Sequence, residues 1–222
     1  MHRLLLAVSC GFALWAQTAP DVQTLVEKTY PKSTRLKEIR MPEIVRELRI
    51  ADGSRVADVG CGSGELSVIL AQVVGATGKV YCEDIGDDKQ WGIPAARVTF
   101  KKHKVRNGEV IRGQPNDPRL PASTLDAVMI VNAYHEMPQY QAMLQHIREG
   151  LKPGGRLVIM DNRPNRTASR QRDKQTNNHV LSVDLAASEI EAAGFRIVRR
   201  DDAFLDDPDS EGAHWLIAAE RP

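Results

Sequence analysis

The chain has 222 residues, of which 42% are hydrophobic, 27% charged and 5% aromatic, and its 30 Lys and Arg residues nearly balance 29 Asp and Glu residues. These figures exclude a polybasic tail, a highly charged disordered chain and a collagen-like repeat. They predict one globular domain of ordinary size.

The N-terminus has the pattern of a secretory signal peptide. A positive charge in residues 1–3 precedes an uncharged apolar run at residues 4–15, and small residues follow. The run is shorter than the roughly 20 apolar residues of a membrane-spanning helix, so we expect no transmembrane span. We predict cleavage after Ala16 and export to the periplasm or the cell exterior. The alternatives are a buried N-terminal helix in a cytoplasmic protein and lipid attachment at Cys10.

Three segments are expected: a signal peptide at residues 1–16, a helical segment at 17–50 and the main domain at 51–222. In the second of these, Met41, Ile44, Val45 and Leu48 have the spacing of one helix face. A short strand at 55–59, a glycine loop at 60–64 and a helix at 66–73 follow in that order.

The same alternation continues to the C-terminus. Strands are predicted at 79–85, 109–112, 125–131, 156–160, 195–199 and 214–219, and helices at 89–104, 140–151 and 183–193. Residues 125–131 are the most apolar of the strands, as in a strand that is buried on both faces. This order predicts an α/β fold, a three-layer α/β/α Rossmann-like sandwich around a mostly parallel sheet.

The glycine loop and an acidic strand end together indicate a nucleotide-type site. Gly60, Gly62 and Gly64 stand at a strand-to-helix turn, where backbone can approach a ligand closely. Glu65 occupies the position where a dinucleotide-binding fingerprint needs a small residue, which counts against NAD. Asp84 ends the next strand, where its carboxylate can accept hydrogen bonds from both ribose hydroxyls. Glu83 is the less favoured ligand because it points to the opposite face.

The chain resembles class I S-adenosylmethionine-dependent methyltransferases of the group often labelled type 11 or type 25. The resemblance rests on four motifs in order: DVGCGSG at 58–64, GKVYCEDI at 78–85, RLPASTLDAVMIVNAYHEM at 119–137 and LKPGGRLVI at 151–159. It covers roughly residues 41–222. It implies a seven-stranded sheet with strand seven antiparallel, and S-adenosylmethionine as cofactor.

The resemblance also implies a set of cofactor contacts. The methionine moiety would lie over the backbone of residues 60–64, with Asp58 near its amino end, and Asp84 would bind the ribose. The implied cofactor-binding residues are Asp58, Gly60, Gly62, Gly64, Asp84, Ile85, Gln114 and Asn132. Many relatives have Asp where this chain has Gln114, whose carbonyl oxygen can still accept a hydrogen bond from an adenine amino group.

Candidate acceptor-site residues follow the strand at 125–131. His135 has a pKa range suited to a general base, and its alternative role is to cap the next helix or pack beneath a loop. Tyr134 and His179 are candidate substrate contacts, although a surface loop is the alternative for His179. Glu136 completes a possible metal-ligating set with the two histidines. Because adjacent His and Glu residues do not form the i, i+4 zinc face of a metalloprotease, no metal is predicted.

Cysteine and charge patterns identify no further site. Cys61 and Cys82 have no base or cation at a fixed short spacing, which favours small buried residues over nucleophiles, and no disulfide scaffold is expected. Basic residues gather at 163–174 and acidic ones at 201–211. The basic stretch has no interleaved aromatics for base stacking, so no nucleic-acid partner is expected.

The leading hypothesis is a methyltransferase acting on a small-molecule substrate, with no prediction for its oligomeric state. The alternatives are a protein carboxyl methyltransferase of the isoaspartyl type, a cofactor-binding module without turnover, and an NAD-binding protein. The segment at 78–85 favours the isoaspartyl type, but the sequence Gly113-Gln114-Pro115 replaces the acidic turn that this type carries.

Overall fold

The computed structural model describes residues 21–165, 171–206 and 213–222. The predicted signal peptide therefore lies outside the described residues. Within those ranges, no helix combines the length and the apolar character needed to cross a membrane.

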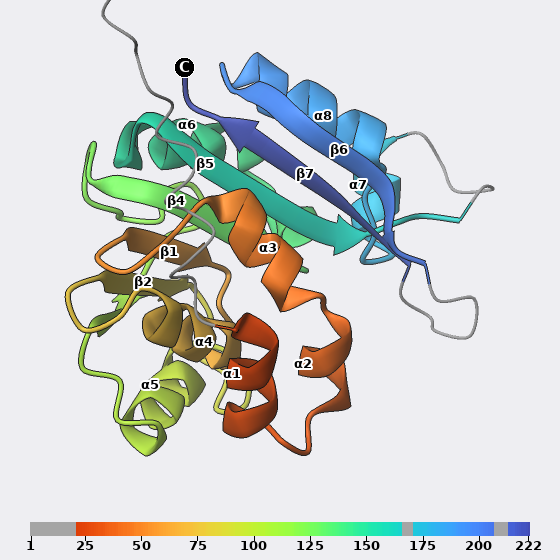
Figure 1. Cartoon of the computed structure of the whole chain (residues 1–222). Helices are drawn as coiled ribbons and strands as arrows, with labels where there is room; N and C mark the ends of the chain where they lie inside the picture. The colour runs from red at the N-terminus through yellow and green to blue at the C-terminus, as the bar shows by residue number, and fades with distance from the viewer. Residues whose placement is uncertain (1–20, 166–170, 207–212) are drawn as a thin grey trace, which may run out of the picture.

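A seven-stranded sheet forms the centre of the molecule, in the order β3-β2-β1-β4-β5-β7-β6 (Figure 1). Strands β1 to β5 are parallel, and β7 is antiparallel to both β5 and β6. The strands are β1 (Arg55–Val59), β2 (Lys79–Asp84), β3 (Gly108–Arg112), β4 (Leu125–Val131), β5 (Leu151–Asn162), β6 (Arg196–Leu205) and β7 (His214–Glu220). This is the fold class that the sequence predicts.

Helices cover both faces of the sheet. On one side lie α1 (Val22–Thr29), α3 (Met41–Leu48), α4 (Glu65–Val73) and α5 (Ile93–Lys102), with the short α2 (Thr34–Glu38) beside them (Figure 1). On the other lie α6 (Tyr140–Gly150) and α8 (Val183–Ala192). The short helices η1 (Tyr134–Glu136) and α7 (Arg172–Thr176) follow β4 and β5.

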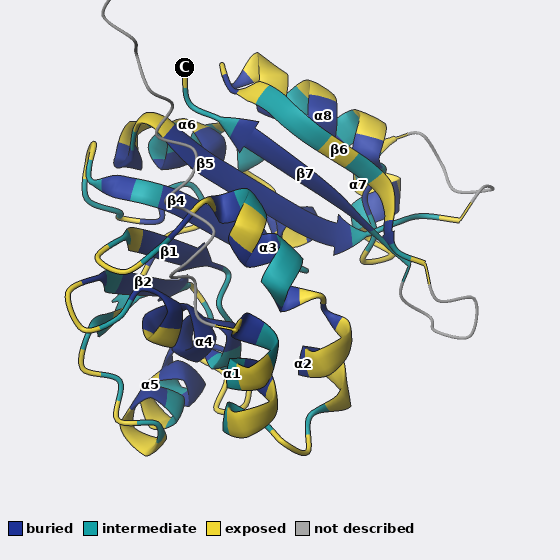
Figure 2. Cartoon of the chain, viewed as in Figure 1, coloured by how far each residue is buried: buried dark blue, intermediate teal, exposed yellow. Residues whose placement is uncertain are grey.

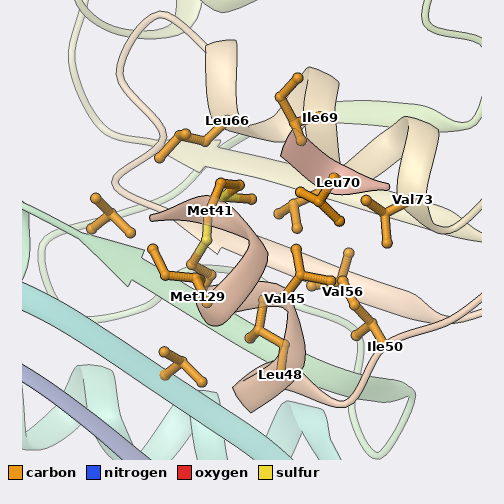
Figure 3. Packing of buried hydrophobic residues seen from close by; sticks show 14 of the residues in the cluster. Met41, Val45, Leu48, Ile50, Val56, Leu66, Ile69, Leu70, Val73 and Met129 are labelled. Atoms are coloured by element: carbon orange, nitrogen blue, oxygen red, sulfur yellow. The ribbon is translucent and has the colours of Figure 1, made fainter. Parts of the chain in front are cut away.

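Alternating strand residues divide the core between the two faces. Val56 and Met129 pack with α3 and α4 on one side, whereas Ala57 and Val128 pack with α6 and α8 on the other. Figure 3 shows Met41, Val45 and Leu48 of α3 meeting the apolar face of α4 across this layer. Central strands are buried on both faces, while the outer surfaces of the helices are exposed (Figure 2). The burial explains why β4 reads as a nearly continuous apolar run.

Several predicted boundaries differ from the structure. The helix predicted at 89–104 begins only at Ile93, because Pro94 fits the first turn, where its missing N–H is not needed. The predicted strand at 156–160 extends to Leu151–Asn162, and the one at 195–199 becomes Arg196–Leu205. Asp201 and Asp202 therefore belong to β6 rather than to an acidic loop.

One ion pair joins the basic and acidic segments in the part of the chain that the structure describes. Arg163 contacts Asp206 at 2.7 Å, and its guanidinium also donates to the backbone oxygen of Asp202 at 3.0 Å. Residues 166–170 and 207–212 of these segments lie outside the described part. Arg163 thus connects the residues that follow β5 to those at the end of β6.

Candidate functional site

A cavity of about 620 Å³ opens at the carboxyl ends of the parallel strands. Its wall includes the glycine loop after β1, the end of β2 and the segment after β4, with α2 contributing one residue. The lining residues are Arg35, Asp58, Gly60, Cys61, Gly62, Ser63, Glu65, Leu66, Glu83, Asp84, Ile85, Gly86, Trp91, Pro115, Val131, Asn132, Ala133, Glu136, Met137, Pro138 and Met143. This is where an open α/β sheet places its ligand.

The glycine loop passes so close to the β4 segment that Gly60 has no room for a side chain. Its φ is +73°, and a Cβ there would stand 2.5 Å from the Cβ of Ala133. The backbone N–H groups of Gly60 and Cys61 both donate to the backbone oxygen of Glu83 at 2.9 Å. The loop is therefore held between β2 and β4 with its backbone along the cavity.

Asp84 is positioned at the cavity by two backbone donors. Its carboxylate accepts hydrogen bonds from the N–H of Gly62 at 2.9 Å and from that of Gly86 at 2.7 Å. The side chain is only half-buried. Each carboxylate oxygen keeps lone-pair capacity for a ligand hydroxyl, because an ionised carboxylate accepts about four hydrogen bonds.

Asp58 is a buried acid beneath the loop. Its carboxylate accepts a hydrogen bond from the Ser67 hydroxyl at 2.6 Å. Burial raises the pKa of Asp58 to about 7; the Ser67 hydrogen bond and the Arg35 charge oppose the rise, and the Asp84 charge adds to it. Arg35 and Asp58 thus place opposite charges on one side of the cavity.

Two buried oxygen atoms in the cavity wall have no hydrogen-bond partner among the described residues. They are Oδ1 of Asn132 and Oε1 of Glu83. Burial, followed by the charge of Asp84, raises the pKa of Glu83 to about 8. A bound ligand with suitable donors would satisfy these oxygens, which fits a nucleotide-like cofactor.

The structure does not place every predicted cofactor residue on the cavity wall. Gly64 packs toward Ala96 and Cys82 instead. Gln114 is exposed, and the neighbouring Pro115 lines the cavity in place of Gln114. The contacts of Gln114 with adenine stay a prediction. Asp58, Gly60, Gly62, Asp84, Ile85 and Asn132 do line the cavity.

Sequence reasoning missed Arg35 and Trp91. Arg35 comes from a short helix with no motif, and Trp91 is an isolated aromatic with a side chain that lies near Gly62. Neither has a pattern that marks it as a ligand-binding residue. Only the path of the chain brings them to the cavity.

Cys61 and Cys82 form a disulfide with a Cα–Cα distance of 5.6 Å. The sequence predicts two small buried residues and no disulfide scaffold; Cys82 is fully buried as expected, but the disulfide was not predicted. The two residues are close because Cys61 directly follows β1 and Cys82 lies in the neighbouring β2. The disulfide ties the cavity side of the glycine loop to the sheet.

Beside the cavity, His135 is buried and oriented by Asp161 at the end of β5. The ring Nδ1 of His135 and its backbone N–H both donate to the Asp161 carboxylate, at 2.7 and 2.8 Å. Burial lowers the pKa of His135, but the hydrogen bond to Asp161 and the charges of Asp161 and Glu136 outweigh it and raise the pKa overall. Because Nδ1 is hydrogen-bonded to Asp161, the other ring nitrogen, Nε2, faces Glu136 and lies 3.5 Å from its Oε1.

The remaining two acceptor-site candidates lie in different environments. Tyr134 is fully buried and its hydroxyl donates to Glu189 at 2.7 Å, so it is not on the cavity wall. Its predicted contact with substrate gains no support from this position. His179 is 73% exposed and lies 3.2 Å from Glu136 through its Nδ1.

The fold and the cavity define a class I S-adenosylmethionine-dependent methyltransferase domain. A model of the methyltransferase-domain family matches residues 50–207, and the chain belongs to this family. Demethylmenaquinone methyltransferase of Listeria welshimeri serovar 6b is 29% identical over 119 residues, which cover 54% of this chain and 49% of that protein. The chain spans about half the length of the curated relatives it matches.

Solved structures share the fold over most of the chain. An S-adenosylmethionine-dependent methyltransferase from Aquifex aeolicus has a TM-score of 0.70 at 23% identity, covering 90% of this chain and 98% of that one. Geranyl diphosphate C-methyltransferase from Streptomyces coelicolor A3(2) has a TM-score of 0.68 at 14% identity, covering 91% and 87%. The [4+2]-cyclase SpnF has a TM-score of 0.69 at 14% identity, covering 85% and 82%.

Proposed function

We propose that this protein transfers a methyl group from S-adenosylmethionine to a small-molecule acceptor. The observation that carries the proposal is the Asp84 carboxylate, held by two backbone donors at the edge of a cavity that the glycine loop lines. The cavity volume lies within the roughly 300–1,000 Å³ of small-molecule and cofactor sites. Curated relatives that are demethylmenaquinone methyltransferases support a small acceptor.

The charges in the cavity suit the two ends of the cofactor. Arg35 and Asp58 match the carboxylate and the ammonium group of its methionine moiety, and the unpaired Asn132 oxygen offers another acceptor to the ammonium group. The Asp84 carboxylate would accept hydrogen bonds from both ribose hydroxyls. Ile85 and Trp91, which are 49% and 59% exposed, provide apolar surface for the adenine ring.

Apolar residues in the cavity wall suit the acceptor. Val131, Met137, Pro138 and Met143 lie there. A sulfonium donor is already activated, so the protein contributes chiefly by holding the acceptor in line with the methyl group. An electron pair of the acceptor forms the new bond to the methyl carbon while the carbon–sulfur bond breaks toward sulfur, leaving S-adenosylhomocysteine. An acceptor that carries a proton at the reacting atom releases it to a neighbouring base or to water.

Titration calorimetry with S-adenosylmethionine, S-adenosylhomocysteine and NAD tests the cofactor. We expect the first two to bind and NAD not to bind; selective NAD binding would overturn the proposal. A screen of quinols, phenols, thiols and amines with radiolabelled donor then tests transfer. Cofactor binding without transfer to any acceptor would instead favour a binding module.

We also propose that the protein is exported. The N-terminal apolar run and the Cys61–Cys82 disulfide support this, because disulfides persist in oxidising compartments. Mass spectrometry of the purified protein should find an N-terminus at Gln17, and cell fractionation should find it outside the cytosol. An intact Met1 on a cytosolic protein would overturn export without affecting the methyltransferase proposal.

A further inference from the structure

Three metal-ligating side chains meet at the edge of the cavity. They are His135 and Glu136 of η1 and His179, which follows α7. One ligand atom from each lies within 4.8 Å of the others. Glu136 also lines the cavity, which places the cluster beside the space for the acceptor.

The two distances from Glu136 to the histidines match those between ligand atoms of a bound metal ion. Oε1 of Glu136 lies 3.5 Å from Nε2 of His135 and 3.2 Å from Nδ1 of His179. Ligand atoms about 2.0–2.1 Å from a tetrahedral zinc ion lie roughly 3.3–3.4 Å apart. The three side chains would therefore need only small adjustments to bind one ion.

His135 has the second-sphere partner that metal-binding histidines typically have. The fully buried Asp161 accepts the Nδ1 proton of His135 at 2.7 Å, which leaves the lone pair on Nε2 and holds the ring in place. Asp161 also accepts hydrogen bonds from the backbone N–H groups of His135 and Asn162. The orientation of the ring is thus set before any ligand arrives.

The backbone also holds His179 in position. The side-chain amide of Asn162 donates to the backbone oxygen of His179 at 2.9 Å, and the N–H of His179 donates to Thr176 at 3.0 Å. His179 has a φ of +55°, which is uncommon for a residue with a side chain. The end of β5 therefore fixes the ring of His135 through Asp161 and the backbone of His179 through Asn162.

We infer that Nε2 of His135, Oε1 of Glu136 and Nδ1 of His179 form a binding site for a divalent first-row metal ion such as Zn²⁺. Two imidazoles and a carboxylate suit Zn²⁺, Fe²⁺ or Co²⁺ better than Mg²⁺ or Ca²⁺, which prefer all-oxygen sites. Three protein ligands leave a fourth coordination position open, as in catalytic rather than structural zinc sites. On the basis of the proposed function, that position would take an oxygen or sulfur atom of the acceptor.

The test measures metal binding directly on the mature protein with its affinity tag removed. We expect one Zn²⁺ per chain by mass spectrometry of metals, and competition with a chromophoric chelator gives the affinity. His179→Ala and Glu136→Gln should each weaken binding at least tenfold, because each removes a ligand. His179 is exposed, so its removal should leave the fold intact. His103→Ala, at the C-terminal end of α5 and outside the cavity wall, is the control for the loss of a histidine.

Substitution with Co²⁺ tests the geometry. The visible spectrum should be that of a four-coordinate Co²⁺ ion. Azide should bind at the open coordination position and shift this spectrum. Zinc binding that is unchanged in His179→Ala, or no stoichiometric binding at all, would overturn the inference. Titration with S-adenosylmethionine on the same samples separates this outcome from failure of the proposed function, because cofactor binding does not require the metal.

Discussion

The Asp161 carboxylate and the His135 ring form a buried hydrogen-bonded pair, 2.7 Å apart, that joins the end of β5 to the segment after β4. Asp161 is fully buried and the His135 side chain is 3% exposed. A carboxylate in such a place must keep its hydrogen bonds, because an unpaired buried charge costs several kcal/mol. The pair therefore fixes the imidazole beside the cavity.

Asp161→Asn should keep the size of this side chain and remove its charge. We expect the free energy of unfolding to fall by about 1–3 kcal/mol in urea titrations, because the amide replaces a charged acceptor. Asp173→Asn, on the exposed surface of α7, is the control and should change stability by less than about 0.5 kcal/mol. Equal stability of the two variants would mean that Asp161 does not hold His135.

Asp84→Ala should weaken S-adenosylmethionine binding by about tenfold to a hundredfold, because the ribose loses a charged acceptor worth about 1.5–3 kcal/mol. Calorimetric titration measures the change. Glu109→Gln, an exposed acid in the adjacent edge strand β3, should bind the cofactor like the wild type. Unchanged affinity of Asp84→Ala would remove Asp84 from the site.

Gly60→Ala should lower both stability and cofactor affinity. The new Cβ would stand 2.5 Å from that of Ala133, and the φ of +73° adds strain. The double variant with Ala133→Gly should recover part of the loss, since it removes the clash and leaves the strain. If the single variant has the melting temperature and the cofactor affinity of the wild type, the glycine loop does not pass as close to Ala133 as the structure indicates.

Removal of the Cys61–Cys82 disulfide should destabilise the protein by about 3 kcal/mol, the value expected for a closed loop of this length. Cys82→Ala with Cys61→Ala should melt at a lower temperature and bind S-adenosylmethionine more weakly, because the loop loses its tie to β2. Reducing agent should have the same effect on the wild type. Thiol titration that finds free cysteines in the unreduced protein would contradict the disulfide.

Glu83→Gln should make stability less dependent on pH. The pKa of Glu83 is raised from 4.5 to about 8 by burial and by the neighbouring charges of Asp84, Asp58 and Asp117. Between these two values the folded state holds a proton that the unfolded state has lost. The free energy of unfolding should therefore fall as pH rises, by at most about 1.4 kcal/mol per pH unit for this one group.

Urea titrations at several pH values measure this effect. The stability of Glu83→Gln relative to the wild type should increase steadily from about pH 5 to pH 8 and then level off. Glu109→Gln, at an exposed acid, is the matched control variant. A parallel pH dependence of Glu83→Gln and the wild type would indicate that Glu83 is not held in its neutral form.

The sequence determined the framework of this protein, because local spacing decides which residues enter helices and strands. The segments at 41–48, 55–59 and 125–131 form elements with the predicted bounds. The glycine loop follows β1 and Asp84 ends β2, so the order of the elements was enough to predict that both lie at the cavity. Element ends were less predictable, since pairing with β4 and β7 extends β5 beyond its apolar centre.

Only the tertiary structure decided which distant side chains touch. Cys61 meets Cys82 because β1 and β2 are neighbours in the sheet, and His179 reaches Glu136 because the chain after β5 turns back over the end of β4. Such contacts depend on the path of loops, and loops have no periodicity that relates residues 43 positions apart. The sequence thus determined where a cofactor site would form, and the packing of loops around it decided which groups complete that site.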